Sequence, residues 1–87
     1  MKITLDMVEK KIERINLFFK TENPKWNTVG AYLINIGNGG YTLERVANIW
    51  GGVDNTFRIG YVSKPDFYKY LVGFEACLQE MESRRII

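Results

Sequence analysis

The chain has 87 residues, of which 46% are hydrophobic and 14% aromatic, so it is too apolar to be disordered, and its length predicts a single domain over residues 1–87. Twelve basic residues oppose ten acidic ones, and a net charge of only +2 gives no strong field that would steer the chain toward nucleic acid. With no histidine and one cysteine, Cys77, the chain cannot form an internal disulfide or a metal site of thiolate and imidazole ligands.

The first predicted element is an amphipathic helix over residues 6–20. Asp6 and Glu9 have the spacing of a capping box, which marks the start of a helix. Asn23-Pro24 ends it, because the residue before a proline avoids the helical conformation. Apolar residues recur at intervals of three and four and therefore share one face: Leu5, Val8, Ile12, Ile15 and Phe19.

Two strands joined by a tight turn are predicted next. Residues 28–36 are rich in β-branched and aromatic types, which favour a strand. Residues 37–40, "GNGG", are typical of a hairpin turn, since Asn38-Gly39 tolerates the positive φ angles of a type I′ turn. A second strand is predicted over residues 41–50. Its side chains alternate, with Tyr41, Leu43, Arg45, Ala47 and Ile49 on one side and Thr42, Glu44, Val46, Asn48 and Trp50 on the other.

A loop over residues 51–55 and a third strand over residues 56–62 follow, the strand being indicated by the alternation of Phe57, Ile59 and Tyr61. The last element is a helix that begins after Ser63, a good N-cap, with Pro65 in its first turn.

An apolar seam then runs along this helix: Phe67, Leu71, Phe74, Leu78 and Met81, widened by Tyr70 and Cys77. Gly73 lies inside the helix, where glycine costs ~1 kcal/mol relative to alanine. We therefore expect close packing at Gly73 against the sheet or the other helix.

The order helix, strand, strand, strand, helix predicts an α+β fold. Short connections favour a three-stranded antiparallel meander, and two amphipathic helices can both cover one face of it, which gives a two-layer sandwich. The other face of the sheet is then open to a partner or to solvent. The residues expected on this open face are Thr42, Glu44, Val46, Asn48, Trp50 and Arg58.

The sequence offers few candidate residues for catalysis or for binding phosphate or metal. The glycine pairs Gly39-Gly40 and Gly51-Gly52 adjoin predicted strands rather than opening a helix, so we interpret them as turns and not as phosphate-binding loops. No histidine can serve as a general base, and Cys77 is expected to be a small buried hydrophobe. We therefore expect no catalytic residues, no metal, no cofactor and no enzymatic activity.

The location expected from the sequence is the cytoplasm, without membrane contact. No apolar run approaches the roughly 20 residues that would cross a bilayer. Charged residues interrupt the N-terminal segment "MKITLDMVEKKIERI", where a signal peptide would need a continuous apolar stretch.

The function expected from the sequence is protein binding. Trp50, Arg58, Asn48 and Asn55 are the predicted contact residues, because Trp and Arg are enriched at binding hot spots. The partner is another protein or a second copy of the chain in a homodimer.

Two alternatives stay open. One is a small anionic ligand such as a nucleotide, held in a cleft formed by the 51–55 loop with Arg45, Arg58 or Lys64, where Gly51 and Gly52 belong to the loop. The other is single-stranded nucleic acid stacked on the open face, which the low charge and the missing pattern of aromatics on a central strand disfavour.

A pattern in the second half of the chain resembles small uncharacterised proteins encoded by tailed bacteriophages and prophages. It consists of Gly39, Gly40, Tyr41, Leu43, Asn48, Gly51, Gly52, Lys64, Leu71 and Gly73. The resemblance implies a small accessory protein that acts in the cytoplasm of an infected or lysogenic bacterium, and it implies no particular biochemical activity.

Overall fold

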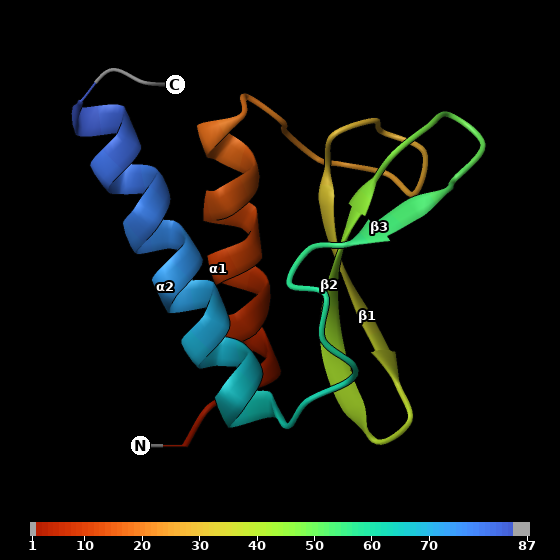
Figure 1. Ribbon diagram of the computed structural model, residues 1–87, viewed down its shortest axis with the longest axis vertical. Coiled ribbons are helices and arrows are strands. Elements are labelled where there is room, and N and C mark those ends of the chain that lie inside the picture. Colours follow the sequence, from red (N-terminus) through yellow and green to blue (C-terminus); the bar gives the residue numbers. More distant parts are fainter. Residues whose placement is uncertain (1, 85–87) are drawn as a thin grey trace.

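Two helices pack on one face of a three-stranded antiparallel sheet (Figure 1). The structure is a computed structural model that describes residues 2–84. Its elements are α1 (Leu5–Phe18), β1 (Tyr32–Gly37), β2 (Gly40–Val46), β3 (Val53–Asn55) and α2 (Lys64–Ser83). The strands are ordered β1-β2-β3, α1 contacts β1, α2 contacts β2, and the helices contact each other. The predicted α+β architecture is confirmed.

The N-cap of helix α1 lies two residues before the one that the sequence predicts. Thr4 is the N-cap, and its side-chain oxygen accepts a hydrogen bond from the backbone N–H of Met7 at 3.2 Å. Asp6 lies inside the first turn and pairs with Lys10 at 3.3 Å, so the prediction that Asp6 caps the helix is wrong. The helix also ends before the predicted boundary, because Lys20 already has a positive φ of 56°.

The hairpin between β1 and β2 has the predicted turn. Gly37 and Gly40 are register partners, and the two residues between them, Asn38 and Gly39, have φ angles of 48° and 73°. Both strands are shorter than expected. β2 ends at Val46, because the next residue, Ala47, donates its N–H to the oxygen of Gly52 at 2.7 Å and so closes a loop.

The third strand lies earlier in the chain than residues 56–62, and that prediction is wrong. Residues Val53–Asn55 form β3, and the side chain of Asn55 then turns the backbone out of the strand. Its oxygen accepts the N–H of Arg58 at 3.0 Å, and its amide donates to the oxygen of Ile59 at 2.8 Å. Arg58 consequently adopts a φ of 54°, which no strand accommodates.

The core lies between the helices and the sheet. Its buried residues are Val8, Ile12, Ile15, Tyr32, Leu43, Phe67, Leu71 and Leu78. The ring of Tyr32 contacts those of Phe19 and Phe74, with centroids 5.7 and 5.4 Å away. Tyr41 stacks on Phe67 at 6.0 Å, which ties β2 to α2. The fully buried side chains are mainly aliphatic, and these aromatic contacts add to their packing at the boundary between the helices and the sheet.

Helix α2 has the predicted N-cap, but its buried face differs in part from the predicted apolar seam. The side-chain oxygen of Ser63 accepts the N–H of Asp66 at 3.3 Å. Cys77 is exposed, so the expectation that it is buried is wrong. Glu75 is buried instead, and its carboxylate binds the ammonium of Lys11 on α1 at 2.8 Å. An ion pair therefore forms part of the contact between the two helices.

Gly73 does not mark a close helix contact. It is exposed, and a Cβ built on it would meet nothing within 4 Å, which contradicts the predicted packing. Gly73→Ala should therefore stabilise the protein by about 1 kcal/mol, because alanine restricts the unfolded chain and favours the helix. Urea denaturation measures this change. Gly40→Ala is the contrasting variant, since its Cβ would lie 2.7 Å from the oxygen of Val62, and it should destabilise. Equal effects of the two would contradict the analysis.

Stability should fall at high pH because of Tyr32. Burial raises the pKa of Tyr32 above its ordinary value of 10.0, and the nearby charge of Arg45 offsets part of that rise. The folded protein thus holds the phenolic proton more tightly than the unfolded chain does. This contribution is fully present below the unfolded pKa and is lost as the pH rises through the folded pKa. Urea denaturation at about pH 8 and about pH 11 should show a smaller loss in Tyr32→Phe than in the wild type, and identical losses would contradict it.

Candidate partner-binding site

The face of the sheet away from the helices is not the exposed surface that the sequence predicts. Thr42 is only 3% exposed and Val46 is fully buried. The backbone N–H of Val46 donates to the oxygen of Ala31 at 2.9 Å, and Val53 on β3 is its register partner. Of the six residues predicted for the open face, only Glu44 is a half-exposed strand residue. Thr42 and Val46 are buried, and the other three lie in loops: Asn48, Trp50 and Arg58.

The loop between β2 and β3, residues 47–52, is held by one side chain. The Oδ1 atom of Asn48 accepts hydrogen bonds from the N–H groups of Trp50 and Gly52, at 2.9 and 3.0 Å. The backbone oxygen of Asn48 accepts a third, from Gly51, at 3.2 Å. Asn48, predicted to contact a partner, is thereby occupied in fixing the loop.

Gly51 brings this loop against the connection between α1 and β1. Its φ of 84° favours glycine, and a Cβ on it would lie 2.7 Å from the Cε3 atom of the Trp26 ring. Gly52 is similarly close to the side chain of Asn48, at 2.5 Å from a built Cβ to Nδ2. The glycine pair therefore serves a tight turn and close packing, in agreement with its interpretation as turn residues.

The most exposed apolar side chains gather at this end of the sheet. Trp50 is 83% exposed and Trp26 is 64% exposed. We call the group the tryptophan end and define it as Trp26, Val29, Ile49, Trp50 and Val53, all exposed. The two loops that carry it lie at the end of the sheet opposite the β1–β2 turn (Figure 1). Five of the twelve large hydrophobic residues exposed within residues 2–84 lie here, including the three most exposed, Trp50, Trp26 and Ile49.

Trp26 is the residue that sequence reasoning missed. It lies in the segment "NPKWN", whose predicted role was only to end a helix. A signal was present, because tryptophan is rare on surfaces that bind nothing and this is one of only two in the chain. Its contact with Gly51 joins segments that are far apart in sequence, and no local pattern reports that contact.

The residues predicted for an anionic ligand come together only in part. A groove of about 660 Å³ beside β3 is lined by Arg45, Asp54, Asn55, Thr56, Arg58 and Ile59. Two of the predicted basic residues, Arg45 and Arg58, lie in it with Asp54 and Asn55 of the 51–55 segment. Gly51 and Gly52 line the loop instead. Lys64 starts α2, next to the segment that pairs with Tyr41 at the other end of β2.

Comparison of the chain with protein-family models, with curated proteins and with solved structures finds no significant match. Within residues 2–84, acidic, cysteine and histidine side chains form no group of three or more that could hold a metal ion. No helix of that part of the chain has the length and apolar character needed to cross a membrane.

The side chain of Asn48 should decide whether the loop is ordered. Asn48→Ala removes the acceptor of two hydrogen bonds, and we expect a loss of about 1 kcal/mol in the free energy of unfolding, since the site is exposed. Faster amide hydrogen exchange at Gly52 should accompany it. Asn48→Asp is the matched control, because a carboxylate still accepts both bonds. Exchange at Gly52 that is unchanged in Asn48→Ala would refute this role.

Proposed function

We propose that the protein is a non-enzymatic interaction module that binds a protein partner through the tryptophan end. One observation carries the proposal: Trp50 is 83% exposed on a loop whose backbone is fixed by its own hydrogen bonds. Leaving an indole in water forgoes the free energy of its burial, and exposed apolar patches mark interaction sites. Tryptophan is also among the residues most enriched at binding hot spots.

The fixed loop favours binding further. A side chain on a rigid loop loses less conformational entropy when it is immobilised by a partner. Trp50 and Gly52 are both tied to Asn48, and Trp26 lies against Gly51, so the surface is organised before a partner arrives. A partner with an apolar pocket therefore needs to order only side chains, not the loop.

Polar residues beside the tryptophan end supply a rim. Arg45, Asp54 and Arg58 line a common groove next to Val53. Polar rims around an apolar centre are typical of protein interfaces, and the rim gives specificity more than affinity. Arg58 keeps its predicted contact role in this proposal, whereas Asn48 and Asn55 act as supports of the loops.

The two other classes of ligand have less support. An anionic ligand in the groove beside β3 would meet Asp54 as well as Arg45 and Arg58, and the carboxylate would repel it. Nucleic-acid binding gains its affinity from phosphate neutralisation, and a net charge of +2 supplies little of it.

The resemblance to phage and prophage proteins stays a prediction and adds a setting: the cytoplasm of a bacterial host. In that setting the partner is a host protein, a phage protein or a second copy of this chain. The three are separated by sedimentation of the pure protein and by capture from infected cells.

Trp50→Ala tests the proposal. We expect the variant to fold as the wild type does, because the side chain is exposed, and to lose about 2 kcal/mol or more of binding free energy toward the partner. The partner is captured with tagged wild-type protein, identified by mass spectrometry, produced pure, and its Kd measured by calorimetry.

Val72→Ala is the control, because Val72 is an exposed apolar residue on α2, away from the tryptophan end. It should leave the Kd unchanged. Equal affinity of Trp50→Ala and the wild type, with both folded, would overturn the proposal. Sedimentation of the pure protein that shows a Trp50-dependent dimer would identify the partner as a second copy.

A further inference from the structure

Strand β1 has a free edge. It is the outer strand of the order β1-β2-β3, with β2 on its other side. At Tyr32 the outward backbone groups are occupied: the N–H donates to Oδ1 of Asn16 at 2.7 Å, and the oxygen accepts from Nδ2 at 3.0 Å. The side chain of Asn16 thus pairs with the strand as a neighbouring strand would.

The same outward positions recur at every second residue, so the backbone groups of Ile34 and Ile36 face the same edge as those of Tyr32. The hydrogen bonds of their register partners on β2 support this orientation. Leu43, the partner of Ile34, bonds to Thr56, and Tyr41, the partner of Ile36, bonds to Val62, so both bond on the side away from β1. Within residues 2–84 no hydrogen bond occupies the outward groups of Ile34 and Ile36. Two donors and two acceptors are therefore available along the edge.

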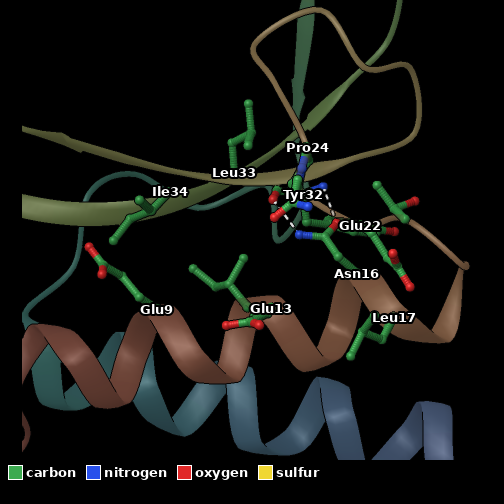
Figure 2. Close-up of a pocket in the computed structure, with 12 residues that line it drawn as sticks. Glu9, Glu13, Asn16, Leu17, Glu22, Pro24, Tyr32, Leu33 and Ile34 are labelled. Carbon is green, nitrogen blue, oxygen red and sulfur yellow. Dashed lines mark hydrogen bonds between the residues drawn. The ribbon is translucent and has the colours of Figure 1, made fainter.

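A groove of about 640 Å³ runs between this strand and α1. Its walls carry three carboxylates and no basic side chain: Glu9, Glu13 and Glu22. Figure 2 shows Glu9 on α1 directed toward the space beneath β1, with Ile34 directed into it from the strand, whereas the carboxylate of Glu13 lies along α1 at the lower wall. None of the three carboxylates takes part in an ion pair in the described chain. The apolar part of the lining includes Ile12 and Leu17.

We propose that this edge and groove bind an extended peptide that carries Arg or Lys at alternate residues. The peptide adds as a fourth strand to β1, pairing with Ile34 and Ile36, as in other cases of strand addition to a sheet edge. Every second side chain then points toward the groove. The aliphatic stems lie against Ile34 and Ile12, and the charged heads reach Glu9 and Glu13.

The charges select this occupant over a second copy of the chain. The sequence of β1, "YLINIG", has no basic residue, so pairing with another β1 would leave the carboxylates of both copies without a counter-charge. The site also shares no residue with the tryptophan end. The two surfaces can therefore be tested separately.

The probe is an acetylated and amidated hexapeptide that alternates Arg and Thr, with a fluorescent label. We expect saturable binding by fluorescence anisotropy, and slower amide hydrogen exchange at Ile34 and Ile36. The double variant Glu9→Gln, Glu13→Gln should bind about fivefold more weakly, since each exposed ion pair contributes about 0.5 kcal/mol. Trp50→Ala should bind the probe as the wild type does.

Backbone pairing is separated from charge attraction by a second peptide. The same hexapeptide, with N-methyl groups on the alternate amides that would face β1, keeps its charge and cannot donate to the strand edge in that orientation. We expect the affinity of this peptide to be lower by at least about tenfold, because its hydrogen bonds to the strand edge are lost. A hexapeptide that alternates Glu and Thr should not bind.

Two binding results would overturn the proposal: no binding of the parent peptide at millimolar concentration, or equal binding of the N-methylated peptide. A dimer of the protein that is dissociated by Ile36→Lys but not by added probe peptide would also overturn it, because the strand edge would then bind a second copy. Both glutamates are exposed, so the variants should fold, and circular dichroism checks that they do. Failure here with a Trp50-dependent partner intact would leave the proposed function standing.

Discussion

The hydrogen-bonded contact between Asn16 and Tyr32 sets the position of the sheet relative to the first helix. Asn16 is only 2% exposed, and its amide both accepts from and donates to the backbone of β1. The connection between α1 and β1 has no helix or strand and could not fix the strand by itself. Because a buried amide without partners is costly, one arrangement is selected. Tyr32 then enters the core, and the Asn38-Gly39 turn fixes the register of β1 with β2.

Two further asparagines fix loop backbone through side-chain hydrogen bonds, as Asn16 fixes the backbone of β1. Asn48 holds the loop before β3, and Asn55 holds the turn after it. Each side chain replaces backbone partners that a regular strand would supply, which explains why β3 is so short. The outcome is a small sheet with one end held by side-chain hydrogen bonds, where Trp50 is exposed.

Sequence patterns predicted those features that depend on neighbours along the chain. Helical periodicity located both helices, and Asn38-Gly39 located the hairpin turn. The third strand was misplaced because Phe57, Ile59 and Tyr61 alternate as a strand does, although the ring of Phe57 packs instead against α2, on Tyr70 and Phe74. Neither the burial of Glu75 nor the contact of Trp26 with Gly51 could be predicted, since each depends on a partner distant in sequence.

The exposure of Cys77 has a practical consequence for anyone handling this protein. It is the sole thiol of the chain and lies on α2, whereas the tryptophan end and the edge of β1 belong to other elements. A maleimide dye or spin label can therefore be attached at one known position without engineering and away from both surfaces. The same thiol can oxidise to a covalent dimer between two molecules, so hydrodynamic measurements need a reductant.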